Sequence, residues 1–166
     1  MKKLTTPFSD GDIVNLEVGD MVYITGYIYC GRDAVLPRIV QDIKEGKLSS
    51  NINLNGYVIF HTAVSDAGVG PTSSNKLEIE SSMGPLSDAG VKMHLGKGKI
   101  KEETVQALAD RNAVYAVIPP VTALLESKTS ERECVAYSEL GMEAFYRIRV
   151  TDYPVIIAAA KGRSIY

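Results

Sequence analysis

Hydrophobic residues along the chain follow two periods, and each period predicts a different kind of element. Runs rich in β-branched and aromatic residues, such as residues 21–29, indicate strands. Apolar residues at helical spacing indicate helices, as at Leu36, Ile39 and Ile43, where Asp33 can cap the start. The predicted strands are 21–29, 56–60, 91–95, 113–118, 134–137, 144–150 and 155–159. The predicted helices lie between Asp33 and Gly46, from Thr72 to just before Gly84, over 101–111 and over 121–126.

These elements predict a mixed α/β fold. The run of consecutive strands after residue 134 argues against a purely alternating Rossmann layout. We expect residues 4–19 to be extended and irregular, and Gly141 and residues 152–154 to form turns between the last strands. No internal repeat and no linker interrupts the pattern, so residues 1–166 are predicted to form a single domain.

Composition narrows the class of protein. The 166 residues are 45% hydrophobic and 23% charged, as in soluble globular proteins, and the formal net charge of −2 offers no electrostatic attraction for nucleic acid or an anionic membrane. No apolar stretch approaches the roughly 20 residues of a membrane span, and no signal peptide is expected. The two cysteines, Cys30 and Cys134, are too few for a disulfide scaffold. We therefore expect a cytoplasmic protein whose cysteines act as small buried hydrophobes.

The segment from Asp66 to Lys76 carries the clearest chemical signal. Two glycines and Pro71 precede three hydroxyl side chains and an apolar-periodic segment, a pattern typical of a tight turn that leads into a helix N-terminus. Such a terminus offers N–H groups and the positive end of the helix dipole to an anion. Lys76 and Lys97 would complete a pocket for a carboxylate or a phosphate.

Common nucleotide and metal motifs do not fit this chain. The loop around Lys97 has one residue too many for a Walker A motif and ends in Gly98 where Ser or Thr is needed. Arg32, between a strand and a helix, can grip a carboxylate or can be a surface residue paired with Asp33. No second ligand stands at metal-binding spacing from His61 or His94, so no metal site is predicted in this chain.

Four short motifs, in order along nearly the whole chain, resemble one family. They are the 27–34 segment around Cys30-Gly31-Arg32-Asp33-Ala34, the Gly70-Pro71-Thr72-Ser73 segment, Gly96-Lys97-Gly98, and the 139–144 segment containing Gly141-Met142-Glu143-Ala144, which is followed by Thr151-Asp152-Tyr153-Pro154. Together they are similar to the C-terminal domain, or separate β subunit, of class I iron–sulfur hydro-lyases, namely fumarase and L(+)-tartrate dehydratase.

The resemblance implies a swivelling β/β/α domain with a mixed sheet and flanking helices. It also implies that Arg32, Lys76 and Lys97 bind a dicarboxylate substrate and that Thr72 is the catalytic base or positions it. Lys76 stands where the family usually has arginine, so the charge is kept and the bidentate fork is lost. Leu36 stands where a histidine often occurs in the family, which leaves the choice of substrate open.

The resemblance further implies a [4Fe-4S] cluster with one open iron. Such a cluster needs three cysteine ligands, and this chain has two, more than a hundred residues apart. We therefore expect the cluster to be bound by an α subunit with three cluster cysteines and not by this chain. The expected protein is the β subunit of a two-subunit fumarase that hydrates fumarate to malate, in a hetero-oligomer, with a homodimer as the alternative for the isolated chain. An L(+)-tartrate dehydratase β subunit, a non-catalytic dicarboxylate-binding module and a purely structural partner subunit are the other interpretations.

Overall fold

The computed structural model describes residues 2–65, 68–72, 76–119 and 128–166, and among these the side chains of 65, 68, 70–72 and 76–78 are outside the description. The strands are β1 (Lys2–Thr5), β2 (Met21–Cys30), β3 (Val58–Phe60), β4 (Thr62–Ser65), β5 (Gly68–Thr72), β6 (Met93–Gly96), β7 (Val114–Val117), β8 (Thr129–Ala136), β9 (Phe145–Ala160) and β10 (Arg163–Ser164). The helices are α1 (Asp10–Val14), α2 (Leu36–Lys44), α3 (Lys76–Asp88), α4 (Glu102–Asp110) and the 3₁₀ segment η1 (Ser138–Glu143).

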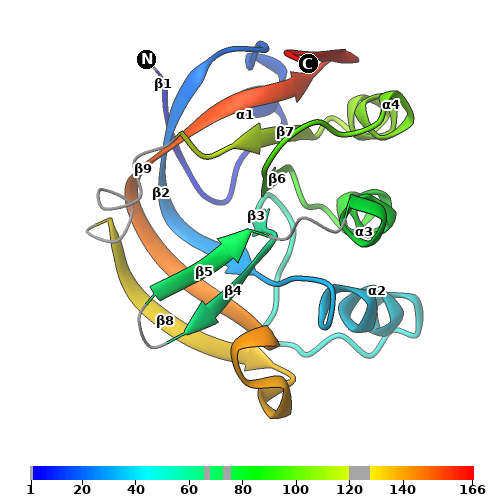
Figure 1. Ribbon diagram of the computed structural model, residues 1–166, viewed down its shortest axis with the longest axis vertical. Coiled ribbons are helices and arrows are strands. Elements are labelled where there is room, and N and C mark those ends of the chain that lie inside the picture. The colour runs from blue at the N-terminus through cyan, green and yellow to red at the C-terminus, as the bar shows by residue number, and fades with distance from the viewer. Residues whose placement is uncertain (1, 66–67, 73–75, 120–127) are drawn as a thin grey trace.

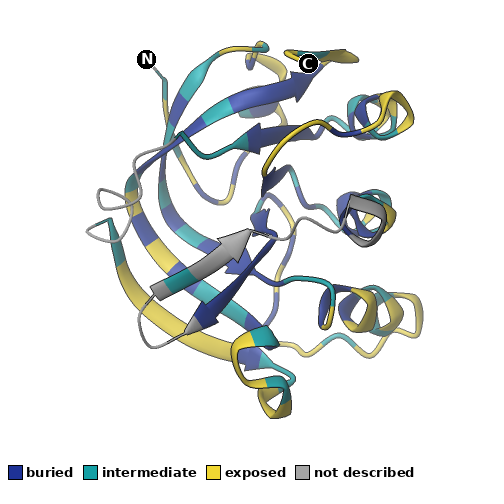
Figure 2. Cartoon of the chain, in the orientation of Figure 1, coloured by how far each residue is buried: buried dark blue, intermediate teal, exposed yellow. Residues whose placement is uncertain are grey.

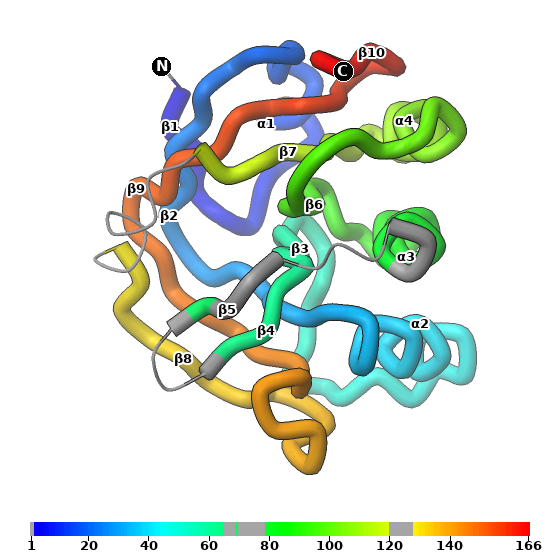
Figure 3. Tube along the Cα trace, in the orientation of Figure 1, coloured from blue at the N-terminus to red at the C-terminus, as the bar shows by residue number. Residues whose placement is uncertain are grey.

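Five strands close into a barrel-like ring. Strands β2, β3, β6 and β7 are parallel neighbours, β9 runs antiparallel to β7, and β9 also pairs with β2 to complete the ring. The trace in Figure 3 shows β2 and β9 side by side along much of their length. Strand β1 adds to β2, strands β8 and β10 add to β9, and β4 and β5 form a separate hairpin. The protein is thus a single α/β domain with a mixed sheet, as predicted.

Three helices lie in a row on one side of the ring, as Figure 1 shows for α2, α3 and α4. The interior of the ring is filled by buried apolar residues, among them Val22, Ile24 and Ile28 of β2. A second apolar cluster joins α2 to the sheet, and a third joins α3 and α4 to β7. Figure 2 shows the buried strands inside and the exposed residues concentrated on the outer faces of the helices and on β8. No helix in the described part of the chain is long and apolar enough to span a membrane.

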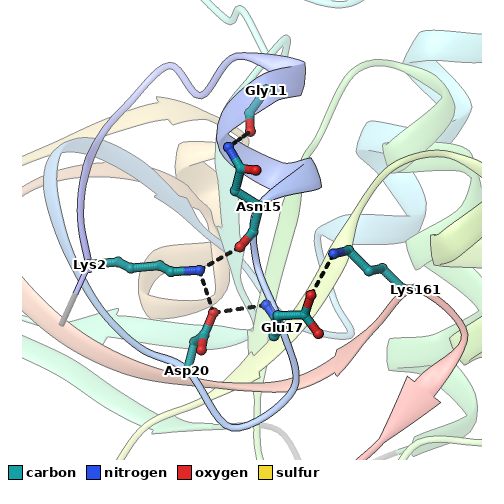
Figure 4. Close-up of polar contacts among 6 residues, drawn as sticks. All are labelled: Lys2, Gly11, Asn15, Glu17, Asp20 and Lys161. Atoms are coloured by element: carbon teal, nitrogen blue, oxygen red, sulfur yellow. Dashed lines mark hydrogen bonds and ion pairs between the residues drawn. The ribbon is translucent and has the colours of Figure 1, made fainter.

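The N-terminal segment is more ordered than its sequence predicts. Residues 4–19 were expected to be irregular, yet they contain part of β1 and the helix α1, whose start has a capping box formed by Ser9 and Asp12. Figure 4 shows how the Lys2 ammonium group donates to the Asn15 carbonyl and to Asp20. Asp20 also accepts the N–H of Glu17, which in turn pairs with Lys161. Polar contacts therefore join β1, the segment after α1 and the turn after β9.

Most predicted elements are present, but several boundaries were wrong. Thr72 ends strand β5 instead of starting a helix, and α3 begins at Lys76 and continues past Pro85 to Asp88. Val35, not Asp33, occupies the N-cap position of α2. The predicted turn at 152–154 lies inside the continuous strand β9. The predicted helix 121–126 lies outside the described residues.

The two cysteines differ in environment. Cys30 is completely buried in β2, as expected, and burial raises the pKa of its thiol. Cys134 was expected to be buried and is exposed. The reason is that β8 lies on the outside of β9, where five consecutive residues face solvent.

Candidate functional site

Three parallel strands end side by side, and their ends define a surface that we call the carboxyl edge. Cys30 of β2 is in register with Phe60 of β3, which is in register with Leu95 of β6. The alignment continues past the strand ends, because Gly31 donates its N–H to the Phe60 carbonyl at 3.0 Å and His61 donates to that of Leu95 at 3.0 Å. Ligands of parallel α/β sheets bind outside the carboxyl ends of the strands, which makes this edge the candidate site.

The register brings two predicted cations to this edge. Arg32 follows the end of β2, and Lys97 follows the end of β6 directly. Only β3 separates these two strands, so their axes lie about 10 Å apart at a spacing of about 4.8 Å per strand. The exposed side chain of Lys97 and the half-buried one of Arg32 therefore both start from this edge.

Arg32 is held by Glu143, a residue far from it in the sequence. Both carboxylate oxygens of Glu143 accept from its guanidinium group, one from Nε at 3.2 Å and the other from Nη2. The hydrogen bond from Arg32 to Glu143 and the charge of that carboxylate raise the pKa of Arg32 against a lowering effect of burial, and Asp33 adds to the rise. Arg32 thus bonds to η1 across the fold, and the charge of Asp33 also acts on it.

The loop that carries Lys97 has a defined shape. A Cβ atom at Gly96 would lie 3.0 Å from the Tyr115 hydroxyl oxygen, so a larger residue would push against β7. Gly98 has φ +74°, a conformation that favours glycine, and its carbonyl accepts a hydrogen bond of 3.0 Å from that same hydroxyl group. Tyr115 is 1% exposed, and burial raises the pKa of its hydroxyl. The two glycines thus let the backbone pack closely against Tyr115 while Lys97 stays on the surface.

The other two predicted residues are placed by their backbone alone. Thr72 ends β5 and pairs with Thr62, and Thr62 follows His61 at the end of β3. The backbone of Thr72 is therefore close to the carboxyl edge. Lys76 is the first residue of α3. The side chains of Thr72 and Lys76 lie outside the description, so the structure brings together Arg32, Lys97 and the Thr72 backbone, and leaves the reach of Lys76 open.

A buried histidine pair lies at this edge, and nothing in the sequence pattern predicts it. His61 and His94, both fully buried, are joined by a hydrogen bond of 3.1 Å between Nε2 of His61 and Nδ1 of His94. On its other side, Nε2 of His94 lies 3.0 Å from the Ser87 hydroxyl oxygen in α3. Burial, together with the positive charge that His61 can carry, holds the pKa of His94 well below its usual range, and a hydrogen bond to the backbone of Met83 opposes this shift in part.

The histidine pair joins the parts of the site. His61 lies on the same small pocket as Arg32 and Asp33, which is closed by Leu36 and Ile79. Because the partner of His61 is 33 residues away on the neighbouring strand, only a known strand order could have suggested the contact. The two rings connect β3, β6 and α3 directly below the surface that presents Arg32 and Lys97.

No iron–sulfur site is formed by the described residues. They contain no group of three or more histidine, cysteine or acidic side chains that could hold a metal ion. Cys30 is buried in β2 with a protonated thiol, and Cys134 is exposed on β8. The donor set of this chain therefore does not fit a cluster with three thiolate ligands.

Comparison with known proteins identifies the family. Residues 2–166 match the family model described as the fumarase C-terminus. The chain belongs to this family. The L(+)-tartrate dehydratase subunit beta of Escherichia coli K12 is 33% identical over 172 residues, covering 95% of this chain and 83% of that protein. A protein of Methanocaldococcus jannaschii with the same name, given provisionally, is 31% identical and covers 93% of this chain and 86% of its own length.

A longer relative contains the fumarase C-terminus as one part. A Geobacillus stearothermophilus protein, provisionally named fumarate hydratase class I, is 29% identical over 98% of this chain, which spans 33% of that protein. The fumarase C-terminus family therefore includes both separate β subunits and a segment of a larger chain, and the names of these relatives are those of hydro-lyases. The resemblance seen in the four motifs is confirmed.

The buried histidine pair predicts a loss of stability in weak acid. A histidine in the unfolded chain takes up a proton near pH 6.5, whereas His94 in the fold stays neutral, so the unfolded state binds more protons as the pH falls. Between pH 7.5 and 5.5 the free energy of unfolding should drop by about 1.4 kcal/mol from this residue alone. Urea unfolding of the wild type and of His94→Gln should show a shallower pH dependence in the variant. Equal slopes would show that His94 is not kept neutral by the fold.

Proposed function

We propose that this chain is the β subunit of a two-subunit hydro-lyase that reversibly hydrates fumarate to malate. The observation that carries the proposal is that Arg32 and Lys97 both follow strands that end at one carboxyl edge, in a chain of the fumarase C-terminus family. A substrate with two carboxylates needs cations at two points, and an arginine fork together with a lysine on a strand two positions away supplies them. Lys76 is proposed as a third cation at the start of α3.

L(+)-tartrate is the second candidate substrate. The relatives that this chain matches over most of their length are named as β subunits of tartrate dehydratase. Fumarate and tartrate both carry two carboxylates on four carbons, so the same cations suit either. The groups around the middle carbons decide between the two substrates, and these groups include the partner subunit.

Proton transfer at carbon is proposed for Thr72. Its backbone lies next to the carboxyl edge through the pairing of β5 with Thr62 of β4. A threonine hydroxyl is a poor base, so it needs a neighbour that takes up or passes on its proton. In this proposal Thr72 holds or moves the proton, Arg32 and Lys97 hold the carboxylates, and the fold excludes water from below the site.

The partner of this chain is proposed to be an α subunit with three cluster cysteines. The described residues do not fit a cluster, and the names of the separate relatives include the term subunit beta. A [4Fe-4S] cluster on the α subunit would supply electrophilic assistance to loss of the hydroxyl group. Because Arg32 and Lys97 must then reach a substrate bound by another chain, the carboxyl edge is proposed as the face toward the α subunit.

Reconstitution tests the proposed function directly. The purified chain, supplied anaerobically with iron and sulfide, should hydrate no fumarate and dehydrate no tartrate. With the cluster-bearing α subunit added, turnover should appear with one of the two. Robust turnover by the isolated chain would exclude the two-subunit assignment, and an α–β complex inactive on both substrates would exclude the proposed reaction.

Lys97 should be the most sensitive lysine of the site. A charge-assisted hydrogen bond to a carboxylate contributes roughly 1.5–3 kcal/mol, so Lys97→Ala should lower kcat/KM of the complex about ten-fold or more. Lys76→Ala should cost less, because Lys76 replaces an arginine and lacks the bidentate fork. Lys99→Ala, which removes an exposed lysine from the same loop, is the matched control and should leave kcat/KM unchanged. A larger loss with Lys76→Ala would reverse this ranking.

Thr72 should act through its hydroxyl group. Thr72→Val keeps the volume and removes the donor and acceptor, whereas Thr72→Ser keeps both. If Thr72 moves the proton, Val should lower kcat by about 10²–10⁴-fold while Ser keeps much of the activity. The measurement is kcat of both variants in the complex, with the melting temperature as a check on folding. Equal kcat for Val and Ser would remove Thr72 from the proposed mechanism.

A further inference from the structure

The 3₁₀ segment η1 braces the turn that carries Arg32. At its far end Glu143 binds the Arg32 guanidinium through both carboxylate oxygens. Just before its first residue, the Tyr137 hydroxyl group donates to Asp42 of α2 at 2.6 Å, and the Arg38 guanidinium carbon lies 5.4 Å from the centre of the Tyr137 ring. Contacts that span 111 and 95 residues in sequence are thereby made at the two ends of one short element.

Glu143 is delivered to Arg32 by a backbone of fixed shape. Gly141 has φ +60° and ψ −123°, a conformation open to glycine and strained for other residues. Its carbonyl accepts the Ala144 N–H at 3.1 Å and the Tyr146 hydroxyl at 2.9 Å. The chain is thus kinked at Gly141 and is held there by Tyr146 of β9. A carboxylate presented by such a segment has little freedom to follow a moving arginine.

The contact uses one particular edge of the guanidinium group. An arginine offers a side-on edge, formed by Nε–H and one N–H of Nη2, and an end-on edge, formed by Nη1 and the other N–H of Nη2. Glu143 takes the side-on edge, because its oxygens accept from Nε and Nη2. Because the group is planar, this bond fixes the plane and the direction of the end-on edge. Glu143 therefore fixes how the remaining N–H groups of Arg32 are directed.

We propose that Glu143 is a positioning residue that sets the guanidinium plane of Arg32 for binding of a substrate carboxylate. The inference deepens the proposed function and rests on it for the identity of the ligand. The Arg32–Glu143 pair is half-buried, with side-chain exposures of 28% and 29%, so it is screened less than a fully exposed pair. Positioning by such a pair lowers the entropy lost when the substrate binds.

Simple charge repulsion makes the opposite prediction, which renders the proposal testable. If Glu143 acted only through its negative charge, it would repel a dicarboxylate, and its removal would lower KM. If it positions Arg32, its removal raises KM. Glu143→Gln keeps the size of the side chain but presents one oxygen and one NH₂ group, so it cannot accept two hydrogen bonds from the fork. The sign of the change in KM therefore separates the two roles.

The first experiment compares two glutamates in the α–β complex. Glu143→Gln should raise KM for the dicarboxylate about ten-fold, with kcat changed less than about three-fold, as expected when binding is lost uniformly. Glu133→Gln is the matched control, because Glu133 also pairs with an arginine, Arg147, at 2.9 Å, but on the outer strands β8 and β9. Its KM should equal that of the wild type. An unchanged or lowered KM for Glu143→Gln would overturn the proposal.

A double-variant cycle tests whether Glu143 acts through Arg32. Arg32→Lys removes the fork and with it the side-on pair of hydrogen bonds. In that background Glu143→Gln should raise KM no further, and the two changes should be strongly non-additive. Additive effects would show that Glu143 acts independently of Arg32. Melting temperatures of all variants separate loss of folding from loss of positioning, and Glu143→Asp, which keeps the carboxylate, should recover part of the lost affinity.

A spectroscopic test needs no turnover. In ¹H–¹⁵N spectra of the isotope-labelled chain, the Nε–H signal of Arg32 can be assigned by its absence in Arg32→Lys. Glu143→Gln should shift this signal and speed its exchange with water, whereas Glu133→Gln should not. An Arg32 signal that is indifferent to Glu143→Gln would overturn the proposal. If the wild-type complex turns over neither dicarboxylate, the proposed reaction fails, and the spectra still decide whether Glu143 orients Arg32.

Discussion

The parallel register of β2, β3 and β6 is the constraint on which the candidate site depends. Cys30, Phe60 and Leu95 are aligned, and the residues that follow them emerge at one edge. Side chains alternate between the two faces of a strand, so a shift of one residue in any of these pairings would carry Arg32 or Lys97 to a different position and expose apolar core residues. The packing that fixes the core therefore also fixes the distance between the cations.

The sequence predicted elements well where a single strong period dominates. Strand β2 and helix α4 are close to their predicted bounds, because nine β-rich residues and a clear apolar helix face leave few alternatives. Residues 152–154 were misread, since the turn signals there produce a bulge. Thr25 of β2 stands opposite two residues of β9, and Asp152, at φ +47°, donates its N–H to the Thr25 hydroxyl oxygen. Whether such a signal ends a strand or bends it depends on the partner strand.

The site was predicted in part because its motifs are local. Arg32 and Lys97 stand beside glycines at strand ends, and this can be seen in the sequence. The residues that support them cannot be seen there, because the Arg32–Glu143 pair spans 111 residues and the His61–His94 bond spans 33. Thr72 was assigned to a helix start, but its pairing with Thr62 of β4 makes it the last residue of a strand. Local propensity is overridden here by a hairpin partner ten residues away.

Strand β9 has a consequence for how the protein is made. Its 16 residues form hydrogen bonds with β2, β7, β8 and β10, so the ring closes only when β9 joins β7 to β2, a strand made more than a hundred residues earlier. Such non-local pairing slows folding, and on the ribosome β2 and β7 must wait with one unpaired edge until β9 has left the exit tunnel. The brace on Arg32 also comes from a late segment, because Glu143 is made 111 residues after Arg32.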